Sequence, residues 1–230
     1  MDLKNYREEI KSTQPSRQTM PLREKDWKES RFFNDEIKGI ISEMLTHVEN
    51  EVSRQKVIDQ IRKGLGGDPI PGFILTMIWG FGSNDNRGPS RLSKMLKDLP
   101  GVRKILQAAV SALGNNEIEM AHGCFINGIK STIDRLGISF SSKYLYFAGK
   151  ALAMEKYPLI FDARVAYSLV ALSRPPDEPG ISPLRFVSIQ PKSNWSSYKT
   201  YLEMMYDQAA KLDLEADQIE LFLFDYRGPG

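Results

Sequence analysis

Apolar residues recur at helical spacing along most of the chain, and this pattern indicates a protein built from α-helices. The first such face begins at Asn34 or Asp35 and continues, with a break, to about Ile61. The glycine-rich run 64–69 ends it, and the apolar segment 71–79 that follows has a periodicity that fits helix or strand. Further helices are predicted over residues 90–98, 100–113, 163–172, 195–212 and 214–224. We therefore predict an all-α fold.

A helix, a tight hairpin and a second helix are predicted in the middle of the chain. The first helix covers 117–136, and Gly137 follows where a left-handed C-cap favours glycine. Three serines can cap the helix that comes next, namely Ser139, Ser141 and Ser142. That helix is apolar nearly all round, so Lys143 is a cation in the first turn of a mostly buried helix. This is an unusual place for a cation, because the helix N-terminus is already positive.

An aspartate returns to the same place in the fold. Pro158 forces an extended segment over 159–161, and Asp162 then falls at the N-cap of another helix. The 19 residues from Lys143 to Asp162 enclose one helix and one extended return, which can bring the two side chains together. Taken singly, such a lysine usually extends to water and such an aspartate usually only caps a helix. Their joint spacing favours a functional pair.

The stretch 121–165 resembles the helix–hairpin–helix DNA glycosylases, and most closely their lysine-bearing, 8-oxoguanine-type branch. That family combines a hairpin, a lysine at the head of the second helix, and an aspartate after a proline-containing return. The resemblance implies that Lys143 is the nucleophile and Asp162 its paired carboxylate. It also implies that the hairpin binds a DNA phosphate, through Gly137, Ser139, Ser141 and Ser142. The chain departs from the family at Ser139–Phe140–Ser141, where the hairpin usually has glycine, an apolar residue and glycine.

The resemblance also implies an architecture and a reaction. We expect a glycosylase domain over 31–230, with a central helical lobe at about 64–161, a second lobe from 31–63 plus 162–230, and the active site in the cleft between them. The polar segment 1–30 is expected to be a loosely docked arm. The partner would be double-stranded DNA with a flipped modified nucleotide, and the protein a monomer. Lys143 would displace the base, form a Schiff base and permit β-elimination, which nicks the strand.

The base that would be excised is left open by the sequence. The resemblance implies an oxidised purine such as 8-oxoguanine, whereas the divergent hairpin leaves room for another modified base, for instance in invading phage DNA. Trp79, Phe81 and Trp195 are candidates for stacking on the flipped base. The alternative for Trp79 and Phe81 is that they only cover the core under a long loop. The most basic part of the chain contacts either DNA phosphates or only solvent, at Arg87, Arg91, Lys94, Lys97, Arg103 and Lys104.

Composition narrows the remaining classes. The 230 residues include a single cysteine and two isolated histidines, so we expect no disulfide, no metal site, no iron–sulfur cluster and no cofactor. The longest apolar run, 73–79, is far shorter than the roughly 20 residues that a membrane helix needs. With no signal-peptide pattern at the start, we expect an intracellular protein, associated with the nucleoid if prokaryotic. The net charge of +2 neither demands nor excludes nucleic acid.

Two other classes of function stay open. Hairpin motifs of this kind also bind the DNA backbone without chemistry, but such a module needs no lysine–aspartate pair in a buried cleft. A helical protein–protein adaptor is the third possibility, and it predicts no salt-dependent DNA binding.

Overall fold

The computed structural model describes residues 3–48, 50–82, 87–128, 130–173 and 191–226. These residues form twelve α-helices: α1 (Arg7–Ser12), α2 (Glu24–Lys28), α3 (Asp35–Met44), α4 (Arg54–Lys63), α5 (Ile70–Phe81), α6 (Arg87–Met95), α7 (Leu99–Gly114), α8 (Ile118–Phe125), α9 (Ile138–Ala151), α10 (Ala163–Leu172), α11 (Trp195–Leu212) and α12 (Ala216–Asp225). Two short antiparallel pairs add β1 (Thr19–Pro21) with β2 (Glu51–Ser53), and β3 (Ile126–Asn127) with β4 (Lys130–Ser131). The all-α fold class is confirmed.

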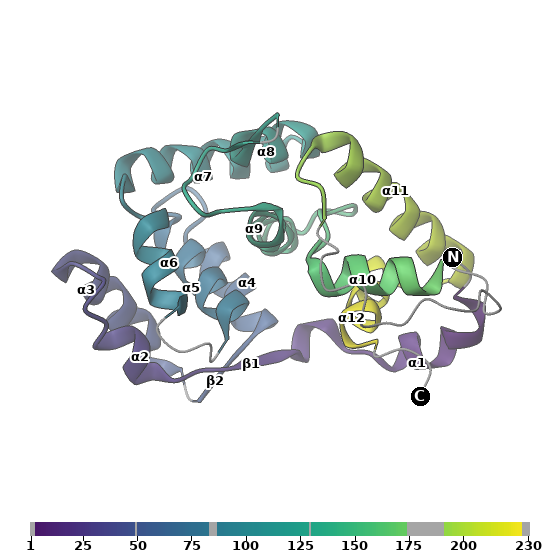
Figure 1. Cartoon of the computed structure of the whole chain (residues 1–230), viewed down its shortest axis with the longest axis horizontal. Helices are drawn as coiled ribbons and strands as arrows, with labels where there is room; N and C mark the ends of the chain where they lie inside the picture. Colours follow the sequence, from purple (N-terminus) through teal and green to yellow (C-terminus); the bar gives the residue numbers. More distant parts are fainter. Residues whose placement is uncertain (1–2, 49, 83–86, 129, 174–190, 227–230) are drawn as a thin grey trace, which may run out of the picture.

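Helix α9 occupies the middle of the molecule. Figure 1 looks nearly along it, with α3 to α6 on one side and α10 to α12 on the other. It packs against α4, α5, α7 and α8, and Tyr144, Leu145, Phe147 and Ala148 are fully buried. This explains why its sequence is apolar nearly all round, since a helix in the centre of a bundle has no solvent face.

Most of the predicted helix boundaries agree with the structure, because the chain caps its own helices. The Asn34 side chain accepts a hydrogen bond from the amide of Ile37 at the start of α3. Ser53 and Asp98 cap α4 and α7 in the same way. The ambiguous segment 71–79 is helical within α5, and α4 ends at Gly64 as the glycine-rich run predicts.

The helix predicted over 117–136 is wrong. Helix α8 ends at Phe125, and β3, β4 and a turn replace its second half. The Thr132 hydroxyl donates to the Cys124 carbonyl at 2.7 Å and closes the end of α8. Gly137 is not a left-handed C-cap either. It is extended (φ −76°) at the N-cap of α9, and the left-handed residue is Arg135 (φ 62°).

The N-terminal segment is not the loosely docked arm that its charge indicates. Leu3, Ile10, Leu22 and Trp27 are all buried. Helix α1 packs on α12, whereas α2 packs on α3 at the opposite side of the molecule. The segment therefore runs across the molecule (Figure 1). Its four buried apolar side chains hold it against the helices, although most of its residues are polar or charged.

The packing of α3 and α4 bears on the expected lobes. Both helices pack on α5, and α4 also packs on α9, so α3 and α4 contact helices that are expected in the central lobe. Helices α10 and α11 pack on α12 at the other side of the molecule. The division into two lobes, with the boundaries given above, stays a prediction.

Candidate active site

Lys143 and Asp162 meet in the structure. The Lys143 Nζ lies 2.8 Å from Asp162 Oδ2 and 3.1 Å from the carbonyl oxygen of Ser139. The side chains keep exposed fractions of 7% and 12%, so the pair is nearly buried yet still reachable from a cavity. Because α9 begins at Ile138, Lys143 is its sixth residue. It lies in the second turn, not in the first turn that the sequence indicates.

Asp162 uses its two carboxylate oxygens for different purposes. Oδ1 accepts hydrogen bonds from the amides of Arg164 (3.1 Å) and Val165 (3.2 Å) and caps α10. Oδ2 is left to face Lys143. Burial acts to raise the pKa of Asp162, but the charge and hydrogen bond of Lys143 and the two amides prevail, and the pKa is lowered. The group is therefore a carboxylate at neutral pH.

The extended return that carries Asp162 is fixed by hydrogen bonds to its backbone. The amide of Phe161 donates to the Ser142 hydroxyl at 3.0 Å. The hydroxyls of Tyr198 and Tyr201 on α11 donate to the carbonyls of Leu159 and Ile160, each at 2.7 Å. A segment held on both sides has few alternative conformations, so the distance between Lys143 and Asp162 is set before any ligand arrives.

A cavity of about 300 Å³ opens beside the pair. Its walls include Trp79 and Phe81, as predicted for a base pocket, together with Phe140, Arg164 and Phe224. Trp195 is not among the residues that line it. The Trp195 ring packs instead against the rings of His122 and Tyr198, at centroid distances of 5.6 and 6.2 Å. The structure thus brings two of the three candidate aromatic residues to the cavity and places the third in the packing of α11 on α8.

The predicted phosphate-binding serines are not equivalent. Ser141 and Ser142 are fully buried, and the Ser142 hydroxyl is engaged with the backbone of Phe161, so in this structure neither hydroxyl is exposed to a phosphate. Gly137 is exposed and Ser139 is half-buried at the start of α9. If the hairpin binds a phosphate, these two positions are the accessible ones.

The sequence does not single out Phe140 as a site residue, and it indicates Arg91 only as one member of the basic group. The Phe140 ring lies 4.4 Å from Phe81, 5.7 Å from the Lys143 Nζ and 5.5 Å from the Arg91 guanidinium. The Phe140 ring therefore lies within cation–π distance of both Lys143 and Arg91. Arg103, another member of the basic group, is paired with Asp68 at 3.0 Å.

Comparison with known proteins was made against families, curated proteins and solved structures. A family described as "Putative 8-oxoguanine DNA glycosylase OGG-like protein" matches residues 13–224, which is most of the chain and includes the pair and the cavity. The chain belongs to this family. No curated protein and no solved structure matches it. Membership in the OGG-like family implies DNA as the class of substrate.

Other features of this OGG-like protein bear on its chemistry. Among the described residues, no three His, Cys, Asp or Glu side chains gather into a group that could hold a metal ion. None of the described helices combines the length and the apolar composition needed to cross a bilayer.

A buried ion pair supports the wall of this cavity. Arg54 on α4 makes two hydrogen bonds to Glu220 on α12, at 2.7 and 3.2 Å, and both side chains are completely buried. The Arg54 guanidinium lies 5.4 Å from the Trp79 ring and 5.0 Å from Tyr146. The Trp79 ring therefore contacts the Arg54 guanidinium, which is itself paired with Glu220 on α12.

The lowered pKa of Asp162 predicts how stability depends on pH. A carboxylate whose pKa is lower in the folded than in the unfolded chain contributes its full stabilisation above about pH 4. That stabilisation is lost as the pH falls below about 4 and the carboxylate is protonated. Thermal melts of wild type and Asp162→Asn should therefore differ by a constant amount from about pH 8 to 5, and the difference should shrink below about pH 4. A difference that already shrinks between pH 7 and 6 would contradict the lowered pKa.

Proposed function

We propose that this OGG-like protein is a DNA glycosylase with lyase activity, in which Lys143 attacks the sugar of a flipped, modified nucleotide. The observation that supports this proposal most strongly is the contact of 2.8 Å between Lys143 Nζ and Asp162 Oδ2 at an aromatic cavity of about 300 Å³. A pure DNA-binding module has no use for such a pair in a nearly buried position.

The first step is displacement of the base. The nucleotide leaves the stack because its sugar C1′ cannot be reached inside the duplex, and the base enters the cavity between Trp79, Phe81 and Phe140. Lys143 Nζ forms a bond to C1′ while the bond from C1′ to the base breaks, and the base leaves with that electron pair. While this bond forms, the Asp162 carboxylate stabilises the positive charge that develops on the sugar. Once the bond to C1′ exists, Asp162 Oδ2 is placed to receive the proton that the Lys143 nitrogen releases, and the departing base takes a proton from water.

The second step is cleavage of the strand. Opening of the sugar ring converts the aminal at C1′ into a Schiff base with Lys143. Loss of a proton from C2′ then expels the 3′ phosphate by β-elimination, and water releases the lysine. Arg164 at the cavity and Arg91 outside Phe140 are cations near enough to the site to bind flanking phosphates.

The test is borohydride trapping on a panel of duplex oligonucleotides. The panel carries 8-oxoguanine, an abasic site, a modified cytosine or only ordinary bases, and each is also assayed for base release. We expect a covalent adduct with the abasic site and with one modified base, and the best duplex identifies the substrate class. DNA binding without adduct or base release on any duplex would favour the non-catalytic module.

Gly80 offers a way to narrow the cavity without replacing either catalytic side chain. A Cβ atom at this position would lie 3.0 Å from Phe140 Cε1 and 3.2 Å from Lys143 Cδ, so both side chains would have to shift. We expect Gly80→Ala to lower single-turnover base release by about 10- to 100-fold, because small displacements of a reacting group are costly. Gly39→Ala is the matched control, since a Cβ there meets nothing within 4 Å. Equal activity of both variants would contradict the expectation that a shift of Phe140 and Lys143 slows base release.

A further inference from the structure

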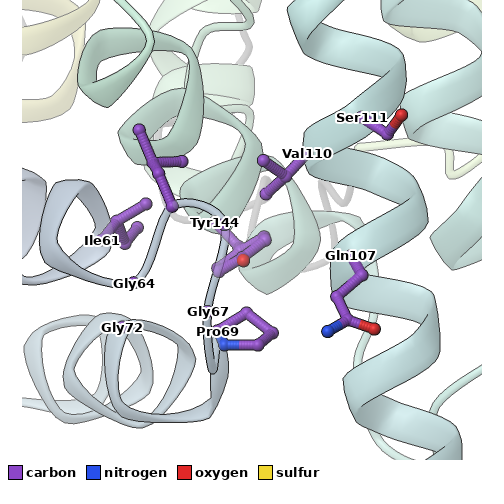
Figure 2. Close-up of a pocket in the computed structure, with 11 residues that line it drawn as sticks. Ile61, Gly64, Gly67, Pro69, Gly72, Gln107, Val110, Ser111 and Tyr144 are labelled. Carbon is purple, nitrogen blue, oxygen red and sulfur yellow. The ribbon is translucent and has the colours of Figure 1, made fainter.

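A second cavity lies at the N-terminal end of α5, away from the active-site cavity at the C-terminal end of that helix. It measures about 320 Å³ and is enclosed by the loop between α4 and α5, by α7 and by Tyr144 of α9. Figure 2 shows the Tyr144 ring reaching towards the turn at Gly67 and Pro69, with Gln107, Val110 and Ser111 on the facing helix. Gly72 and Trp79 line the two cavities from the same helix, and they are roughly 10 Å apart by helix rise.

Tyr144 has a hydroxyl group without a partner. The residue is fully buried, and among the described residues its hydroxyl finds no hydrogen-bond partner. Burial raises the pKa of this phenol, so it stays protonated and able to donate. A buried hydroxyl that lacks a partner is costly, and this one lies at the wall of an open cavity. A bound group with a hydrogen-bond acceptor would satisfy it.

The remaining walls limit what that group can be. Ile61, Leu65, Pro69 and Val110 supply apolar surface, and none of the described residues that line the cavity is a lysine, arginine, aspartate or glutamate. A charged ligand would lose its hydration there without gaining a counter-ion. The polar side chains are Tyr144, Gln107 and Ser111. All three can donate and accept, and a carboxamide such as that of Gln107 can form paired hydrogen bonds with the edge of a nucleobase.

The glycine-rich loop forms one wall of this cavity. A Cβ at Gly64 would lie 2.7 Å from the carbonyl oxygen of Asp68, so the tight turn requires glycine there. A Cβ at Gly67 would meet only the Gly64 carbonyl, at 3.8 Å. The backbone therefore does not require glycine at position 67, and the absence of a side chain there leaves more room in the cavity. Asp68 fastens this loop to α7 through Arg103, one helical turn from Gln107, with contacts of 3.0 and 3.2 Å.

We propose that this cavity binds a free, uncharged, planar heterocycle of the nucleobase type. The ring lies against the backbone of the glycine-rich loop, accepts a hydrogen bond from Tyr144 and pairs its edge with Gln107. The proposal does not depend on the chemistry at Lys143. Because Tyr144 follows Lys143 directly in α9, the ligand would contact the same helix that carries the nucleophile.

Calorimetric titration with 9-methyladenine and 1-methylcytosine tests the site in the full-length protein. We expect one of them to bind with a Kd of about 1 mM or tighter. Val110→Phe fills the cavity and should weaken binding by about 10-fold or more, whereas Ala108→Phe, on the exposed surface of the same helix, should not. Tyr144→Phe deletes only the hydroxyl and should weaken binding by about 2- to 10-fold.

Binding to the active-site cavity must be distinguished from binding to this one. Gly80→Ala narrows the active-site cavity and should leave the affinity for the free base unchanged. The proposal is overturned if neither base binds, because the Tyr144 hydroxyl would then be satisfied by water alone. It is equally overturned if Gly80→Ala abolishes binding while Tyr144→Phe binds as wild type does.

Discussion

Lys143→Gln should form no borohydride-trapped adduct with any duplex, and its rate of base release should fall by roughly 1,000-fold or more. Glutamine keeps most of the length and packing of the side chain but has no amine to form a Schiff base. It can still donate a hydrogen bond towards Asp162 Oδ2, which lies 2.8 Å from Lys143 Nζ in wild type. The fold and the cavity are therefore retained, and the loss reports on the nucleophile.

Lys150→Gln is the matched control for that experiment. Lys150 lies two turns later on the same helix, where it pairs with Asp217 at 3.1 Å and contacts Tyr157. It is not among the residues that line the active-site cavity, so its variant should trap DNA as wild type does. An adduct that survives in Lys143→Gln and disappears in Lys150→Gln would assign the Schiff base to Lys150 and contradict the proposed mechanism.

The position of the candidate pair could be predicted because its signals are local. Pro158 begins the extended segment that follows α9, and the Asp162 side chain caps the next helix. Together they fix where the chain returns to α9, and the distance of 2.8 Å agrees with that expectation. The clamps that hold the return could not be predicted in the same way. Tyr198 and Tyr201 are ordinary core residues by pattern, and their carbonyl partners lie about 40 residues away.

The hairpin shows how periodicity misleads. Ile133 and Leu136 continue the apolar spacing of α8, and both are buried as a helix would require. They are buried from a turn, because Thr132 closes α8 and a two-stranded hairpin intervenes. The spacing of apolar residues reports which positions are buried. The same spacing is compatible with more than one backbone conformation, so it does not by itself establish a helix. The same limit applies to the N-terminal segment, where Ile10 and Trp27 were hidden among charges.

Glu220→Gln should lower the free energy of unfolding by about 3 to 5 kcal/mol, because it leaves the buried cation of Arg54 without its counter-ion. The two residues are 166 positions apart and completely buried, so no local pattern in the sequence indicates the pair. For a chain of this length, such a loss corresponds to a fall in Tm of roughly 6 to 20 °C. Chemical denaturation and thermal melts both measure it. Glu203→Gln is the control, since that carboxylate is exposed beside Lys199 and its loss should leave stability unchanged.

A double variant separates the charge of the pair from its place in the fold. Replacing both partners by apolar residues of similar size, Arg54→Met with Glu220→Leu, should recover most of the lost stability, because no unpaired charge remains. Base release should recover less. The Arg54 guanidinium lies 5.4 Å from the Trp79 ring, and Trp79 forms a wall of the active-site cavity. Without the guanidinium, Trp79 loses the cation that holds it from behind, and the cavity loses its shape. Full recovery of activity together with stability would show that the ion pair acts only on the fold and not on the site.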